Sequence, residues 1–145
     1  DALIEHEDIT LMFDNLQLSE ICQRDLGIKR PSYHNINRLC TKVISSMTVK
    51  LRDGTISSDK YWDGMGEPTC NLVPFPRTHF LISSIAPIWS MQQYNSRFDV
   101  QEMADAVCDS DNFMVKLDDF EQDEDQYLAI MDHYRGNVSS RNANA

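Results

Sequence analysis

Three side chains that could recognise a nucleobase lie near the starts of two predicted helices. Asn15 begins the first helix, and Tyr33 and Asn37 lie one turn apart at the start of the second. Residues four apart share a helix face. An amide offers a donor and an acceptor to a base edge, and a tyrosine ring offers a stacking surface. On spacing alone, ordinary capping and packing roles remain the competing interpretation.

Metal and phosphate chemistry have little support in the residue spacing. The run 118–125 holds six acidic residues among eight, but it lacks the glycine and the terminal glutamate of a helix-loop-helix calcium loop. The chain has five glycines and no glycine-rich phosphate-binding loop. We therefore expect no metal site and interpret the acidic run as a solvated loop. Neither His-x-x-x-His nor Cys-x-x-Cys spacing occurs among His6, His34, His79, His133, Cys22, Cys40, Cys70 and Cys108.

Composition and charge exclude several classes of protein. The 145 residues, 41% of them hydrophobic, fit one globular domain with its own core. Thirteen basic residues against 23 acidic ones give a net charge of −10 with no clustered basic stripe, so we expect no nucleic-acid partner. No apolar run is long enough for a membrane helix, and the widely spaced cysteines indicate buried, reduced thiols in the cytosol. Because patterned sequence begins directly at Asp1, we expect part of a longer chain.

Three helices are predicted from periodicity and capping signals. Apolar residues recur at spacings of three and four over 33–51, which predicts one long central helix with Ser32 as its N-cap. A shorter helix is predicted over 15–25, where Gly27 supplies the left-handed residue after the last turn. Residues 99–107 begin with the capping-box pattern Asp-Val-Gln-Glu and form the third.

Strands and loops fill the rest of the chain. Glycines and prolines over 54–76 predict a long loop with at most one short helical turn. The apolar run 78–84 lies between two prolines and predicts a buried strand. Residues 86–98 are polar and aperiodic, which predicts a second loop. Two further strands are predicted at 113–117 and 126–135, on either side of the acidic run.

The longest distinctive motif resembles a known family. Leu72-Val-Pro-Phe-Pro-Arg-Thr-His-Phe80, followed by Ala86-Pro87, is similar to a segment in the middle of tubulin chains. Arg38 and Tyr134 resemble the alpha members more than the beta members. The resemblance covers nearly the whole chain and corresponds to about the middle third of a tubulin. Other pieces resemble tubulin in the same order: Ile4–Asp8, Phe13–Asn15, Arg30–Leu39, Val43–Leu51 and Tyr134–Val138.

The resemblance implies a mixed α/β (α+β) fold. Residues 1–51 would form the end of a nucleotide-binding domain that includes the long core helix, 33–51. Residues 52–145 would form part of an intermediate domain, a mixed sheet with flanking helices. The family's amino-terminal half, with its glycine-rich phosphate loop, has no counterpart in these 145 residues.

The resemblance also implies functional residues. The positions that hold the guanine base in tubulins match Asn15, Tyr33 and Asn37, which implies GTP as the nucleotide. In alpha-tubulins, a glutamate shortly before an Asn-Leu-Val segment positions the water that attacks the neighbouring subunit's nucleotide. That position matches Glu67, so Glu67 is the candidate catalytic residue. Pro68 disfavours helical geometry at the residue before it, and the alternative is that Glu67 is an inefficient catalyst.

Two functions follow from the resemblance. The first is a divergent alpha-like tubulin, a structural constituent of microtubules that assembles through GTP-dependent longitudinal contacts with a beta-like partner and with neighbouring protofilaments. GTPase activity would then require the complete polymer rather than this chain alone. The alternative is a truncated tubulin-like interaction module, without nucleotide chemistry, in a larger cytoskeletal or ciliary assembly. Both place the protein in the cytoplasm and its cytoskeleton, without nucleic-acid or membrane partners.

Overall fold

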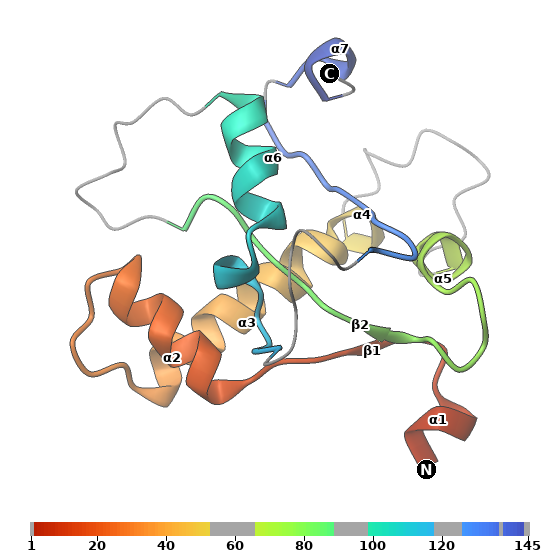
Figure 1. Ribbon diagram of the computed structural model, residues 1–145, viewed down its shortest axis with the longest axis horizontal. Helices are drawn as coiled ribbons and strands as arrows, with labels where there is room; N and C mark the ends of the chain where they lie inside the picture. Colours follow the sequence, from red (N-terminus) through yellow and green to blue (C-terminus); the bar gives the residue numbers. More distant parts are fainter. Residues whose placement is uncertain (1, 53–65, 89–98, 118–125, 137, 144–145) are drawn as a thin grey trace.

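The computed structural model describes residues 2–52, 66–88, 99–117, 126–136 and 138–143 (Figure 1). Helices surround a small two-stranded sheet, which confirms the predicted mixed α/β class. The elements in chain order are α1 (Ala2–His6), β1 (Thr10–Leu11), α2 (Asn15–Arg24), α3 (Tyr33–Met47), α4 (Val49–Arg52), α5 (Gly66–Leu72), β2 (Phe80–Leu81), α6 (Val100–Cys108), the 3-10 turn η2 (Ser110–Asn112) and α7 (Ser140–Ala143).

Local signals define helix α2 at both ends. The Asp14 carboxylate accepts a hydrogen bond from the Leu16 backbone N–H at 3.0 Å, which satisfies a donor that the helix itself leaves unpaired. After the last turn, Gly27 has a φ of +66°, a conformation that glycine adopts without steric cost. The helix predicted over 15–25 is therefore confirmed.

The long central helix is present but interrupted. At its start, the Ser32 backbone N–H and hydroxyl both donate to the Asn35 side-chain oxygen, at 3.0 and 2.7 Å. Helix α3 ends at Met47, and a separate short helix, α4, begins after Thr48. The Thr48 hydroxyl and backbone N–H both donate to the Ile44 carbonyl, at 2.7 and 3.0 Å, but Thr48 itself, with φ −94° and ψ 7°, leaves the helical conformation and ends α3. The prediction of one continuous helix over 33–51 is wrong at residue 48.

The sheet joins a segment near the amino end of the chain to a segment in its middle. β1 and β2 are parallel, with Thr10 opposite Phe80 and Leu11 opposite Leu81. The Thr10 N–H also donates to the His79 carbonyl at 2.8 Å. The strand predicted over 78–84 is thus confirmed in position, although its ladder is only two residues long and its partner, β1, was not predicted.

A fully buried histidine fixes the turn that leads into β2. The two ring nitrogens of His79 lie 3.0 Å from the Pro76 carbonyl oxygen and 3.1 Å from the Leu3 carbonyl oxygen. The ring also stacks on Phe80, with 4.6 Å between the ring centres. Because Leu3 belongs to α1, this one side chain connects α1, the turn and the sheet.

Helix α6 begins where the sequence predicts it. The Asp99 carboxylate accepts from the Val100 N–H at 2.7 Å, and the Asp99 N–H donates to Glu102 at 3.3 Å. The Glu102 backbone N–H in turn donates to the Asp99 side chain, and the two reciprocal contacts between Asp99 and Glu102 form a capping box at the start of the helix. The predicted helix over 99–107 is confirmed, with its end one residue later, at Cys108.

The two strands predicted near the carboxyl end are wrong. Over 113–117, pairing is limited to an isolated antiparallel bridge between Phe113 and Ser84. Among the described residues, 126–135 contain no strand, and Figure 1 shows them as an extended trace that leads toward α7. A strand requires a neighbour to take its backbone hydrogen bonds, and sequence alternation does not supply one.

Most residues of the predicted loops lie outside the described part of the chain. The residues not described are 54–65 of the first loop, 89–98 of the second loop, and the acidic run 118–125. Within the first predicted loop, residues 66–72 form α5, more than the single short turn expected. None of the helices in the described part of the chain is long and apolar enough to cross a lipid bilayer.

One hydrophobic cluster holds α2, α3 and the segment after η2 together. The inward faces of the two helices follow the apolar spacing of the sequence, and Met114 closes the cluster from a distant part of the chain. The backbone supports this packing, because the Asp14 N–H donates to the Met114 carbonyl at 2.8 Å. The fully or nearly buried members are Leu18, Ile21, Cys22, Ile36, Leu39, Val43 and Met114.

Candidate functional site

The three predicted base-binding residues lie at the amino ends of α2 and α3. Asn15 is the first residue of α2, and Tyr33 is the first residue of α3. The Tyr33 side chain is 75% exposed, and Asn15 and Asn37 are also exposed. Because the two helices pack against each other through the common core, they hold the backbones of all three residues. Guanine binding by this set remains a prediction.

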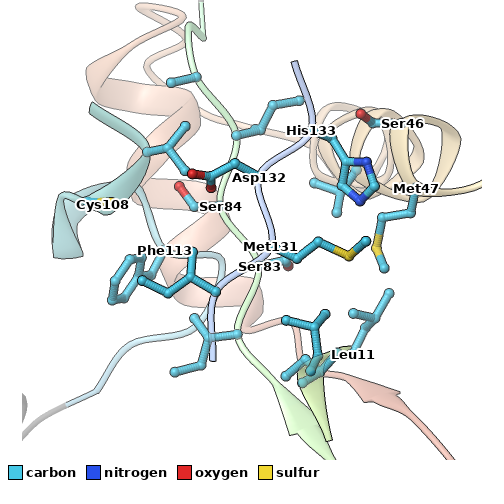
Figure 2. A pocket seen from close by; sticks show the side chains of 18 of the residues that line it. Leu11, Ser46, Met47, Ser83, Ser84, Cys108, Phe113, Met131, Asp132 and His133 are labelled. Atoms are coloured by element: carbon cyan, nitrogen blue, oxygen red, sulfur yellow. The ribbon is translucent and has the colours of Figure 1, made fainter. Parts of the chain in front are cut away.

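Asn37 also lies on the wall of a large open hollow. Its volume is about 1750 Å³, and its walls include α3, the segment 78–87, the inner face of α6 and residues 126–135 and 138. Figure 2 shows the Met47 and Met131 side chains approaching each other across this space, with Leu11 nearby. His133 lies beside Ser46 of α3 in the same view. The hollow is therefore apolar in part, with polar groups along its sides.

The polar groups beside α6 do not form an activated nucleophile. In Figure 2, Asp132 lies close to Ser84 and Cys108. Burial raises the pKa of the Cys108 thiol, and the charges of Asp132 and Asp105 raise it further. Burial and the neighbouring Cys108 likewise raise the pKa of Tyr127. Since the thiolate is the reactive form of cysteine, Cys108 is a poor nucleophile near neutral pH.

Two buried hydroxyls have no hydrogen-bond partner within the described part of the chain. One belongs to Ser83, in the hollow's wall, and the other to Thr10, on β1 and outside that wall. The Ser84 hydroxyl, by contrast, donates to the Asn112 carbonyl at 3.1 Å. Sequence reasoning missed this hollow, including Met131, Asp132 and His133. The available signal was a pair of polar residues, Asp132-His133, inside an otherwise apolar run.

Glu67 lies in helix α5, contrary to the expectation drawn from Pro68. The helix begins at Gly66, so Glu67 is its second residue and Pro68 its third. In the first turn of a helix the backbone N–H has no internal partner, so a proline there costs little. The position of the Glu67 side chain falls outside the described residues.

Metal chemistry has no candidate in the part of the chain that the structure describes. Within the described ranges, no three His, Cys, Asp or Glu side chains gather closely enough to hold an ion. The acidic run 118–125 lies outside those ranges. None of the four cysteines, all of which are described, forms a disulfide bond.

Comparisons of the sequence with known proteins point to one family. A family model described as the tubulin C-terminal domain matches residues 76–145. The chain is also 42% identical, over 146 aligned residues, to the Tubulin alpha-2 chain of Eleusine indica. That alignment covers 99% of this chain and 31% of the relative, so the chain spans about a third of the length of the curated protein that it matches.

Proposed function

Because the chain belongs to the tubulin family and is similar to its alpha members, we propose that it is a structural subunit of cytoplasmic microtubules. It assembles with a beta-like partner through GTP-dependent longitudinal contacts. The observation that carries this proposal is the 42% identity to an alpha-tubulin across 99% of the chain. In this proposal residues 1–51 complete a nucleotide-binding domain, and residues 52–145 contribute to the intermediate domain.

The proposed nucleotide contact is the guanine base. Tyr33 supplies a stacking surface, and Asn15 and Asn37 supply donors and acceptors for the base edge. The exposure of all three side chains supports this role, because none of them is buried in the core. A base-binding set without a phosphate-binding loop holds a nucleotide weakly, since phosphate contacts provide much of the affinity. Strong GTP binding therefore needs the phosphate-binding part of a complete tubulin.

For catalysis, we propose that Glu67 orients the attacking water at the nucleotide of the neighbouring subunit. A carboxylate can accept a proton from that water and align it with the terminal phosphate. The helical backbone of α5 at Glu67 supports the proposal, because the disruption expected from Pro68 does not occur. The reaction then takes place between subunits, as part of the polymer.

One observation favours the second function, an interaction module without nucleotide chemistry. The 145 residues contain no glycine-rich phosphate-binding loop. A module of this kind would bind a cytoskeletal assembly, including a ciliary one, whichever nucleotide is present. Nucleotide dependence therefore separates the two functions.

The test is co-sedimentation of the purified chain with microtubules assembled from tubulin dimers. We expect the chain to pellet with microtubules held in the GTP state and to remain in the supernatant with those in the GDP state, because the tubulin dimers supply the phosphate-binding part that this chain lacks. Tyr33→Ala should reduce the pelleted fraction severalfold, whereas Tyr33→Phe, which keeps the aromatic ring, should not. Equal pelleting with both nucleotides would support the interaction module, and no pelleting would rule out the microtubule subunit.

The Glu67 proposal is tested in the same pellets by phosphate release. Glu67→Gln keeps the size of the side chain but removes its basicity. We expect release to fall about a hundredfold, the scale on which misplaced catalytic groups act, while the pelleted fraction stays the same. Unchanged release would remove Glu67 from the mechanism and leave the proposal of a microtubule subunit intact.

A further inference from the structure

The charges of this chain are segregated along its sequence. From Leu26 to Arg52 there is no acidic residue, although the whole chain has 23. The same stretch holds six of the 13 basic residues, which leaves seven for the rest of the molecule. A net charge of −10 therefore conceals a basic region, and the expectation of no basic cluster needs correction. The six residues are Lys29, Arg30, Arg38, Lys42, Lys50 and Arg52.

The structure gathers part of this region into a cationic stripe, formed by Arg38, Lys42 and Arg52. Arg38 and Lys42 lie four residues apart along α3, so they share one helix face, and both are exposed beside the hollow. Arg52, on α4, reaches back to the same face. Its guanidinium donates to the Ser45 carbonyl and hydroxyl at 2.6 and 2.8 Å, which holds the positive charge against α3.

Helix α6 and the residue after it carry a matching acidic stripe, formed by Glu102, Asp105 and Asp109. Their spacing of three and four residues places them on one face, and all three are exposed. The ion pairs found within the described ranges join Arg24 to Asp25 and to Asp111. Among those residues, both stripes are therefore free of ion pairs.

The two stripes match in spacing but do not face each other within one molecule. Arg38 and Lys42 lie about 6 Å apart along their helix axis, as do Asp105 and Asp109. The opposite face of α6, with Met103 and Val107, lines the hollow of its own chain. The acidic stripe consequently faces away from the hollow and, among the described residues, away from the cationic stripe of its own chain.

We propose that the protein associates with a second copy of itself, the cationic stripe of one copy binding the acidic stripe of the other. Each copy carries both stripes, so the contact joins two different surfaces and can repeat along a row of molecules. Exposed ion pairs contribute little individually, and two chains of charge −10 repel at long range. The association is therefore reversible and depends on protein concentration. It involves no nucleotide and goes beyond the proposed microtubule contacts.

Sedimentation velocity of the 145-residue chain over a range of concentrations, without nucleotide, tests this contact. We expect the wild type to form dimers or short oligomers. The double variants R38E/K42E and E102K/D105K should each raise the apparent dissociation constant at least tenfold. The second variant is the more telling, because it brings the net charge closer to zero and would otherwise favour association.

An equimolar mixture of the two variants should associate again, because each supplies the stripe that the other has lost. Such recovery cannot come from variants that have failed to fold. The matched control is K29E/R30E, which makes the same change in net charge in the loop before α3 and should associate like the wild type. A monomeric wild type, variants that associate normally, a mixture that stays monomeric, or an equal loss in the control would each overturn the proposal.

Discussion

The four cysteines share one side chain but differ in their surroundings. Cys22 is fully buried in the core, and its burial, followed by the charge of Asp25, raises the pKa of its thiol. Cys40 and Cys108 are partly buried, and burial raises the pKa of both. Cys70 is exposed on α5. The expectation of reduced thiols rather than disulfides is confirmed for all four, whereas the expectation of burial is wrong for Cys70.

We predict that iodoacetamide labels Cys70 first and Cys22 last in the folded protein at pH 8. Only the thiolate reacts, and at a given pH a thiol with a raised pKa has less of it. Labelling of Cys22 should rise only at more alkaline pH. At that alkaline pH the free energy of unfolding should also fall, because the unfolded chain releases the Cys22 proton at a lower pH than the folded chain does. Peptide mass spectrometry measures each rate, with urea-unfolded protein as the control; equal rates in the folded state would contradict this assignment.

At the scale of single elements, predictability follows the distance over which the determining interactions act. Helices α2 and α6 are set by residues within or next to them, the caps Asp14 and Asp99 and the terminal Gly27, so the sequence predicts them well. The segment 126–135 also has a local pattern, which favours a strand. Its state depends on whether a neighbouring strand is available, and local sequence does not contain that information.

The same distinction applies to the candidate site. Asn15 and Tyr33 were predicted to lie at helix starts, and they do, because capping is local. The hollow lined by Met47, Met131 and His133 brings together residues more than 80 positions apart, and only tertiary packing creates it. Pro68 shows a third case. Its effect on the backbone at Glu67 depends on whether the proline lies in the first turn of a helix or further along, and the dipeptide Glu67-Pro68 does not specify that position.

At helix α2 the local capping argument makes a quantitative prediction. Asp14→Ala removes the oxygen that accepts from the Leu16 N–H, and loss of such a cap typically costs about 1 kcal/mol. We expect the free energy of unfolding in urea to fall by that amount. Glu20→Ala, an exposed change on the same helix, should stay within about 0.5 kcal/mol of the wild type. If both variants unfolded alike, the cap would not be a determinant of α2.

For the molecule as a whole, one small core has to hold distant parts of the chain together. Leu18 and Leu39 come from the first third of the sequence, and Met114 comes from the last third, yet all three pack in the same cluster. His79 adds a second connection, from the sheet to α1. Because these contacts join the helices and the sheet, loosening the core should affect α2 and α3 together rather than one element at a time.

Leu39→Ala tests that dependence. Leu39 is 1% exposed at the centre of the cluster, and truncation of a buried leucine costs about 2–5 kcal/mol through lost burial and the cavity left behind. Because domains are stable by only about 5–15 kcal/mol, the unfolding midpoint in urea should fall by a large fraction. Leu16→Ala, at a leucine that is 74% exposed on α2, should leave it almost unchanged. Hydrogen exchange should show faster amide exchange in α2 and α3 alike in the Leu39 variant. Loss of protection in α3 alone would show that the cluster is not one cooperative unit.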